Sequence, residues 1–204
     1  WFWYIPQHND MVSVGVVAEG KYLTRGGVKD PGEIFRREIG QNKWIEDHLS
    51  RGTCIGEYWI TGEYTFRSAH CASDGLVLVG DALGFLDPVF SSGLMLALKS
   101  GVFAADVVES ALQRKDYSAG QFSEYGRMMG EGMENMRRLI YAFYDPNDSF
   151  RTVTDKYPEI QGDLTDCLSS DVNKDFSRLF KALGEWTTLP EAMPVGEPMA
   201  RQAG

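Results

Sequence analysis

Cysteine is scarce in this chain, and the few cysteines are too widely spaced to suggest a site. The 204 residues include only Cys54, Cys71 and Cys167. An odd count without a Cys-x-x-Cys pair, and without histidines at zinc-binding spacing, argues against a disulfide framework and a zinc centre. We therefore expect reduced thiols, a cytoplasmic location and no metal.

Long apolar runs and clusters of basic residues are also missing. No stretch approaches the ~18 apolar residues that mark a transmembrane helix, and we expect no secretory signal. The 20 basic and 29 acidic side chains give a net charge of −9. Without a basic run interleaved with aromatics, nucleic acid is excluded as a partner class. We expect no membrane partner either.

The chain contains 22 glycines, yet none forms the Gly-x-Gly-x-x-Gly motif that places a dinucleotide pyrophosphate on a helix N-terminus. The sequence begins with Trp1 rather than Met, and its first residues are typical of an interior strand. We expect the chain to be a segment of a longer protein, or the product of a gene truncated at its 5′ end.

The hydrophobic pattern predicts an α+β chain in which a mixed sheet precedes long C-terminal helices. Strands are expected over residues 1–5, 11–18, 54–67 and 76–79, the last buried on both faces, with a turn at 7–10. Helices are expected over residues 31–50, 92–112, 117–144, 149–157 and 172–186, with a loop at 20–32. The apolar first half of the 92–112 helix predicts deep burial. Residues after 190 should be poorly ordered.

Residues 75–93 carry the most specific signal. The apolar strand runs into Gly80-Asp81, a proline-fixed loop follows, and Ser91-Ser92-Gly93 precedes the long helix. Gly80 permits a cofactor to approach the backbone closely, and Asp81 can accept a hydrogen bond from a cofactor hydroxyl. Ser91 or Ser92 is a good N-cap, and the helix N-terminus favours an anion. The alternative is a strand-to-turn junction before a capped core helix.

Two motifs resemble FAD-dependent halogenases. The segment Gly80-Asp-Ala-Leu-Gly-Phe-Leu-Asp-Pro resembles the second FAD motif of the flavin monooxygenase superfamily, and residues 85–93 fit the halogenase pattern Phe-x-x-Pro-x-x-Ser-x-Gly. Residues 1–6 fit the second halogenase signature, Trp-x-Trp-x-Ile-Pro. The signatures occur in the expected order, and the similarity covers residues 1–18 and 60–112.

The resemblance implies a site and a chemistry. Ser92 and Gly93 would form a halide pocket, and Trp1 and Trp3 would separate the flavin from the substrate. Halide would attack a flavin hydroperoxide to give hypohalous acid, which halogenates an electron-rich aromatic ring. The implied partners are a halide ion, a separate flavin reductase and a small aromatic substrate, free or carrier-bound. The implied FAD contacts are Gly80, Asp81, Phe85, Asp87, Pro88, Ser91, Ser92, Gly93 and Leu94.

One departure bears on the substrate. Halogenases that act on free tryptophan carry a glutamate where Phe90 stands, so the resemblance favours phenolic or pyrrolic substrates. The lysine that delivers halogen in the family lies outside this chain, and no lysine here takes that role. Without that lysine and the glycine-rich motif, we expect the 204 residues alone to bind FAD weakly and to be inactive.

The resemblance also divides the chain, as part of a two-domain flavin monooxygenase-like fold. Residues 1–70 would form a substrate-side sheet and helix, 71–115 the C-terminal part of the FAD domain, 116–190 a helical region and 191–204 a disordered tail. Arg67 would meet a cofactor phosphate or a carboxylate, or form a surface ion pair. Two alternatives remain: a flavin monooxygenase or geranylgeranyl-reductase-like oxidoreductase, and a non-catalytic truncated fragment. The tryptophans favour the halogenase.

Overall fold

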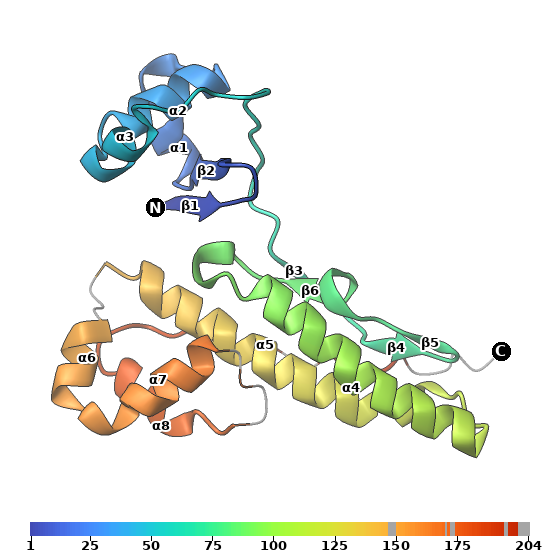
Figure 1. Cartoon of the computed structure of the whole chain (residues 1–204). Helices are drawn as coiled ribbons and strands as arrows, with labels where there is room; N and C mark the ends of the chain where they lie inside the picture. Colours follow the sequence, from blue (N-terminus) through green and yellow to red (C-terminus); the bar gives the residue numbers. More distant parts are fainter. Residues whose placement is uncertain (147–149, 170, 172–173, 194–195, 200–204) are drawn as a thin grey trace. The chain divides into compact units, whose positions relative to one another are not determined.

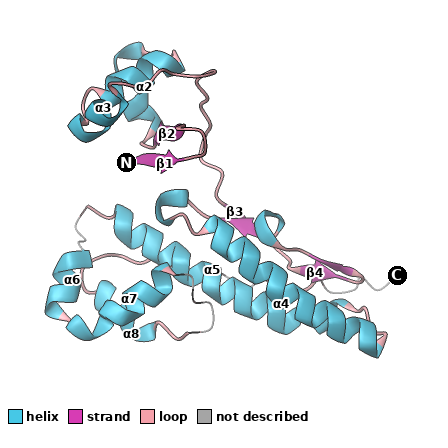
Figure 2. Cartoon of the chain, in the orientation of Figure 1, coloured by secondary structure: helices cyan, strands magenta, loops and turns pink. Residues whose placement is uncertain are grey.

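The computed structural model describes residues 1–146, 150–169, 171, 174–193 and 196–199 (Figure 1). The chain divides into two compact units, Trp1–Glu63 and Tyr64–Gly204. Each unit has its own strands and helices (Figure 2). The functional division of the chain at residues 70, 115 and 190 stays a prediction.

The first unit begins with the predicted antiparallel hairpin. Strands β1 (Phe2–Pro6) and β2 (Val12–Val16) pair so that Trp3 lies opposite Gly15. Asn9 and Asp10 have φ angles of 58° and 54°. Two successive left-handed residues make the turn type whose twist matches that of the strands, which explains why polar residues occupy 7–10.

Two helices replace the single helix predicted over residues 31–50. Helix α2 (Pro31–Ile39) begins at Asp30, whose carboxylate accepts a 2.7 Å hydrogen bond from the Glu33 amide, and ends at Gly40. Helix α3 (Lys43–Leu49) begins at Asn42, whose side chain accepts a 3.2 Å bond from the Ile45 amide. The prediction was wrong because the hydrophobic period continues across a stop signal and a new cap. The expected loop at 20–32 contains helix α1 (Gly20–Leu23) and 3-10 helix η1 (Arg25–Gly27).

The strands that follow residue 50 are shorter than predicted. Strand β3 (Phe66–Arg67) pairs with β6 (Gly84–Phe85), and β4 (Ala72–Ser73) pairs with β5 (Leu76–Val77), both antiparallel. Residues 54–65 form no strand, and Trp59 is 88% exposed. Leu76 and Val79 are exposed as well, so burial of 76–79 on both faces was wrong.

A turn at Asp74-Gly75 explains why residues 76–79 are not buried on both faces. Gly75 has a φ of +73°, which returns β5 directly onto β4 as a hairpin and leaves one side of it open. The α+β class is confirmed. Within the described residues, however, the strands form three separate two-stranded antiparallel sheets rather than one mixed sheet.

Two long helices form the body of the second unit (Figure 1). Helix α4 (Gly93–Arg114) and helix α5 (Ser123–Tyr144, preceded by 3-10 helix η4, Ala119–Phe122) confirm the two long helices predicted. Deep burial of the first half of α4 was wrong, because Leu94 and Leu98 are 73% and 59% exposed. Only one side of α4 packs, through Leu96, Ser100 and Ala104. The methionine-rich inner face of α5 lies in the core, with Tyr125, Met129, Met133 and Met136.

The C-terminal helices enclose a second core. They are α6 (Phe150–Lys156), 3-10 helix η5 (Pro158–Ile160), α7 (Gln161–Leu168) and α8 (Ser177–Leu183). Helix α7 was not predicted. The helix expected at 172–186 is shorter, and the start of that range, like residue 149 of the 149–157 helix, lies outside the described residues. The core includes Leu139, Val153, Ile160, Cys167, Phe176, Leu179 and Leu183.

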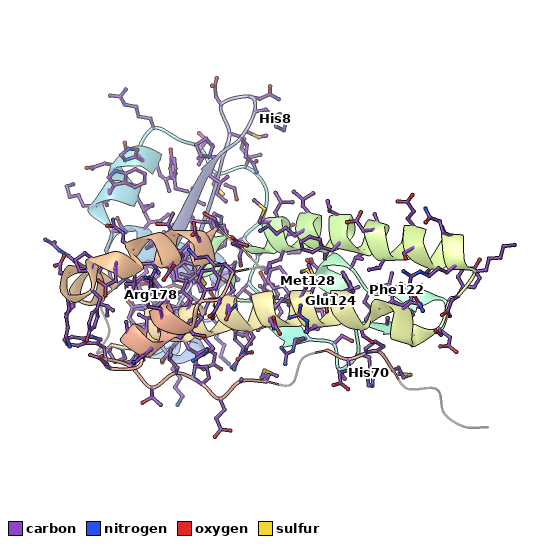
Figure 3. All side chains as sticks on the ribbon, turned by 90° about the horizontal axis from the view of Figure 1, so that it is seen from below. His8, His70, Phe122, Glu124, Met128 and Arg178 are labelled. Carbon is purple, nitrogen blue, oxygen red and sulfur yellow. The ribbon has the colours of Figure 1, made fainter. Side chains whose placement is uncertain are left out.

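Part of the predicted C-terminal tail is held along a strand. The Met199 amide donates to the Ala72 carbonyl at 2.8 Å, and the Cys71 amide donates to the Glu197 carbonyl at 3.3 Å. His70, labelled in Figure 3, forms a parallel β-bridge with Glu197, and its Nδ1 lies 3.3 Å from the Glu197 carbonyl oxygen. Residues 196–199 therefore extend the β4–β5 hairpin, whereas 194–195 and 200–204 lie outside the described residues. No helix in the described part of the chain is long and apolar enough to cross a bilayer.

Candidate functional site

The candidate site is built on the loop that joins β5 to helix α4. Its first turn is 3-10 helix η2 (Gly80–Ala82), in which Gly80 has a φ of +55°. The Gly80 amide donates to Ser100 Oγ at 2.7 Å, and that hydroxyl donates to the Ala97 carbonyl at 2.7 Å. Ser100 thus ties the turn to α4. No motif in the sequence indicated Ser100, although a serine on the apolar face of a predicted helix was a usable signal.

Asp87 and Pro88 fix the second turn of the loop. The Asp87 carboxylate accepts a 2.9 Å bond from the Val89 amide and caps 3-10 helix η3 (Pro88–Phe90). It also accepts a 3.1 Å hydrogen bond from the Tyr144 hydroxyl, at the end of α5. Asp87 therefore shapes the loop, and Tyr144 is a contact that no motif suggested. Asp81, by contrast, is exposed.

Ser92 occupies the N-cap position of α4, as one of the two predicted serines should. Its hydroxyl makes no capping bond, and its Oγ is buried without a hydrogen-bond partner. The residue is only 3% exposed. Ser91, just before it, is left-handed with a φ of 54° and is exposed. Since the first amides of a helix lack internal acceptors, a buried hydroxyl beside them suits an anion.

Gly93 and Phe85 meet at the start of the helix. A Cβ at Gly93 would lie 3.2 Å from Phe85 Cε2. The Phe85 ring in turn contacts Tyr64, with centroids 5.0 Å apart. Leu94 points outward, as its exposure shows. The predicted residues between 80 and 94 therefore lie together, in the turns and the N-cap that lead into α4.

Phe90 lies in an aromatic cluster. Its ring is 5.4 Å from Phe143 and 6.3 Å from Phe150, and it packs against both hydrophobic cores of the unit. The resemblance places a glutamate at this position in halogenases that act on free tryptophan. In this chain the position is apolar.

Arg67 forms an ion pair rather than standing free. Its guanidinium lies 3.9 Å from the Glu134 carboxylate, which also pairs with Arg137 at 2.7 Å. The side chains of Arg67 and Glu134 are only 12% and 11% exposed. Burial lowers the pKa of Arg67, and Glu134 opposes that shift. Of the two interpretations, the ion pair is the one observed, although it is buried rather than on the surface.

Trp1 and Trp3 belong to the first unit, on one face of its hairpin. Their ring centroids are 6.4 Å apart, at an interplanar angle of 59°. Tyr4 points to the other face and packs on α3, 5.3 Å from Trp44 and 5.9 Å from His48. Strand alternation therefore separates the tryptophans from the packed side of the hairpin.

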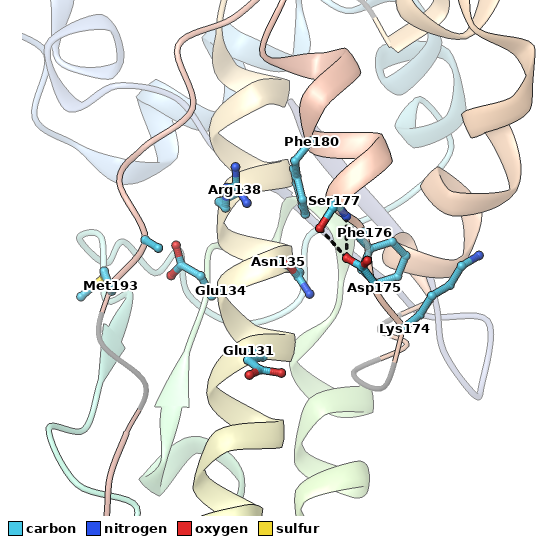
Figure 4. A pocket seen from close by; sticks show the side chains of 11 residues that line it. Glu131, Glu134, Asn135, Arg138, Lys174, Asp175, Phe176, Ser177, Phe180 and Met193 are labelled. Carbon is cyan, nitrogen blue, oxygen red and sulfur yellow. Dashed lines mark hydrogen bonds between the residues drawn. The ribbon is translucent and has the colours of Figure 1, made fainter.

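A cavity of about 460 Å³ lies elsewhere, between α5 and α8 (Figure 4). Its lining includes Asn135, Arg138 and Phe180, and none of residues 80–94. Arg138 stacks 4.2 Å over the Phe180 ring. Among the described residues, no three His, Cys, Asp or Glu side chains gather as a metal site. His8 lies at the hairpin turn and His70 beside Glu197, and neither belongs to the 80–94 loop (Figure 3).

Comparison with known proteins settles the family. The family described as "Tryptophan halogenase" matches residues 1–173. The chain belongs to this family. The 1H-pyrrole-2-carbonyl-[peptidyl-carrier protein] chlorinase of Pseudomonas fluorescens is 29% identical over 84% of this chain and 38% of its own length. The flavin-dependent halogenase armH1 of Armillaria mellea is 31% identical over 55% of this chain and 24% of its own length.

Solved structures agree at the level of fold. The flavin-dependent brominase Bmp2 superposes with a TM-score of 0.74 over 91% of this chain and 46% of its own, at 24% identity. A flavoprotein/dehydrogenase from Cytophaga hutchinsonii gives a TM-score of 0.72 at 25% identity, over 89% of this chain and 44% of its own. This halogenase-family chain thus spans less than half the length of the relatives named here. The predicted family and fold class are confirmed, and the named relatives make a flavin the cofactor of this family.

Proposed function

We propose that this chain is the C-terminal portion of an FAD-dependent halogenase that makes hypohalous acid and uses it on an electron-rich aromatic ring. When bound, reduced FAD and O₂ together oxidise halide to hypohalous acid, with the second oxygen atom leaving as water. The observation that carries the proposal is the buried, unpartnered Ser92 hydroxyl at the N-terminus of α4. It is a polar atom left without a partner at the position where the family resemblance puts an anion.

The residues of the loop have separate tasks in this proposal. The Ser92 hydroxyl and the amides of Gly93 and Leu94 hold halide and the flavin edge, because these donors lack acceptors within the helix. Gly93 and Phe85 set how closely a planar ring can approach. Asp87 and Pro88 hold the loop in shape, as the 2.9 Å cap shows. Gly80, Asp81 and Ser91 complete the contact set. Fixed donors of this kind stabilise charge without reorganisation.

The substrate class follows from Phe90 and from the relatives. An apolar aromatic cluster at Phe90 suits a neutral ring better than the ammonium and carboxylate of a free amino acid. The Pseudomonas fluorescens chlorinase and a Pseudoalteromonas luteoviolacea brominase are both named for pyrrole carbonyl groups on a carrier protein. We therefore propose a phenolic or pyrrolic substrate, free or carrier-bound, Trp1 and Trp3 as the partition beside it, a separate flavin reductase and a cytoplasmic location.

The test uses the full-length protein, supplied with reduced flavin, oxygen and either chloride or bromide. We expect halogenated phenol or pyrrole products. Ser92→Ala should lower kcat/KM at limiting halide by about tenfold or more, the order expected for a lost hydrogen bond to a charged group. Ser123→Ala, which removes an exposed hydroxyl bonded to the Gly120 carbonyl, is the matched control and should be neutral.

The same assay separates the alternatives. A hydroxylated product without halogen would favour the monooxygenase alternative. The non-catalytic fragment would be favoured instead by neighbouring DNA that encodes no upstream segment with the glycine-rich FAD motif. A flavin titration of the 204-residue chain should give only weak binding. Micromolar or tighter binding would contradict that prediction.

A further inference from the structure

The backbone of Ser91 makes the turn before α4 dependent on its neighbours. Ser91 has a φ of 54° although it is not a glycine, and such a backbone persists only where the surrounding structure holds it. Its amide donates to the Pro88 carbonyl at 2.8 Å, so its conformation depends on where η3 is fixed. Since Ser92 follows directly, the direction of its buried hydroxyl depends on the same turn.

The end of helix α5 holds the first residue of this turn. Tyr144 is the last residue of α5, and its hydroxyl lies 3.1 Å from one carboxylate oxygen of Asp87 and 3.3 Å from the other. The nearer oxygen also accepts the 2.9 Å bond from the Val89 amide that caps η3. Tyr144 therefore restrains the carboxylate that shapes the turn.

The neighbouring residue of α5 holds the other end of the turn. The Phe143 ring meets the Phe90 ring edge-on, with centroids 5.4 Å apart and an interplanar angle of 73°. Phe150 of α6 lies 6.3 Å from each of these two rings. Phe143 is also edge-on to Tyr144, at 5.3 Å. Two consecutive residues of α5 thus contact η3 at its cap and at its last residue.

We infer that Tyr144 is a positioning residue, which acts through Asp87 to keep the Ser92 hydroxyl and the first amides of α4 in place for a halide ion. Phe143 supports the same turn from its other end. The inference rests on the proposed function for the halide, whereas the restraint of the turn is a property of the second unit alone. A turn that moves would carry these donors away from the halide and weaken its binding, because Tyr144 itself touches no reacting atom.

The first experiment measures the restraint by hydrogen exchange and mass spectrometry of the full-length protein. Tyr144→Phe keeps the ring against Phe143 and removes only the hydroxyl. We expect the amides of residues 87–93 to exchange about fivefold faster, the factor for one hydrogen bond. Tyr157→Phe is the matched control, because it removes another tyrosine–carboxylate hydrogen bond of the second unit, to Glu185 at 2.8 Å. It should leave exchange at 87–93 unchanged.

The second experiment measures the halide site in the full-length enzyme, with reduced flavin, oxygen and bromide. Tyr144→Phe should raise KM for bromide about fivefold and leave kcat at saturating bromide within about twofold. A purely structural role would instead lower kcat through loss of folded enzyme and leave KM unchanged. Tyr157→Phe should change neither constant.

A double substitution tests whether Tyr144 acts through Asp87. In an Asp87→Ala background, Tyr144→Phe should raise KM for bromide no further, because the carboxylate that it restrains is gone. An equal increase in both backgrounds would overturn the route through Asp87. If Asp87→Ala does not fold, Phe143→Leu carries the test of the turn, since loosening its Phe90 end should also raise KM for bromide.

The outcomes separate this inference from the proposed function. Unchanged exchange at 87–93 in Tyr144→Phe would overturn the restraint. Faster exchange with an unchanged KM for bromide would overturn the positioning role. A wild-type enzyme that forms no hypohalous acid would overturn the proposed function, and the positioning role with it, while the exchange measurement would still report on the restraint.

Discussion

At the scale of single residues, the absence of a side chain at a closely packed glycine is a structural requirement that can be tested. Gly126 lies buried in α5, where an added Cβ would overlap the Gly196 carbonyl and lie 2.5 Å from Cys71 Sγ. Gly126→Ala should lower the free energy of unfolding by about 1–3 kcal/mol, as overpacking of a core does. Chemical denaturation of the chain measures the change.

The control is a glycine in the other long helix. Gly101 of α4 is exposed and has nothing within 4 Å of an added Cβ. Gly101→Ala should therefore stabilise the chain by up to ~1 kcal/mol through helix propensity. Equal effects of the two substitutions would show that residues 196–199 do not pack against α5.

Ser92 illustrates how far residue-level prediction could go. A serine before an apolar helix correctly predicted the N-cap position, because cap preference depends on local sequence. That its hydroxyl would be buried without a partner depends on how the 80–92 loop folds over it, which no local pattern encodes. The Asp87–Tyr144 hydrogen bond, between residues 57 positions apart, escaped prediction for the same reason.

At the scale of elements, one buried carboxylate connects α7 to α8. Asp163 is 5% exposed at its side chain and pairs with Lys174 and Arg178, each at 2.8 Å. The Lys174 hydrogen bond, supported by Arg178 and opposed by burial, holds the pKa of Asp163 below its ordinary value of 3.8. The stability that this pair supplies is present above about pH 4 and is lost as the pH falls through the folded-state pKa.

Asp163→Asn should therefore destabilise the chain at neutral pH, and the difference from wild type should shrink below about pH 4. Denaturant unfolding at a series of pH values measures this. Asp166→Asn is the control, because Asp166 also contacts Lys174 but its side chain is 46% exposed. A destabilisation that stays constant down to pH 3 would show that the ion pair does not connect these helices.

The presence of helices and strands was predicted better than the residues at which they begin and end. The long helices α4 and α5 follow from sustained periodicity, and the β1–β2 hairpin follows from polar turn residues between apolar strands. The apolar run at 94–98 was misread, because a run of apolar residues does not say which side of a helix meets a neighbour. Leu98 is 59% exposed, whereas Leu96 is buried against α5 and the loop.

At the scale of the whole molecule, the chain consists of two units joined by an exposed segment. Residues 52–65 contain no helix or strand, and Ile55 and Trp59 are 79% and 88% exposed. Brief treatment with chymotrypsin should cut here first, after Tyr58 or Trp59, and leave a C-terminal fragment that mass spectrometry can assign. First cleavage within α4 or α5 would contradict the division into two units.

The sequence by itself determined the family signature, the tryptophan hairpin, the two long helices and the cap that begins α4. These depend on neighbours within a few residues, through turn chemistry, periodicity and capping. Only the tertiary structure decided that the Ser92 hydroxyl is buried without a partner, that Tyr144 bonds Asp87, and that Trp3 lies on Gly15. Each of these features depends on how side chains pack in the folded chain rather than on local sequence preference.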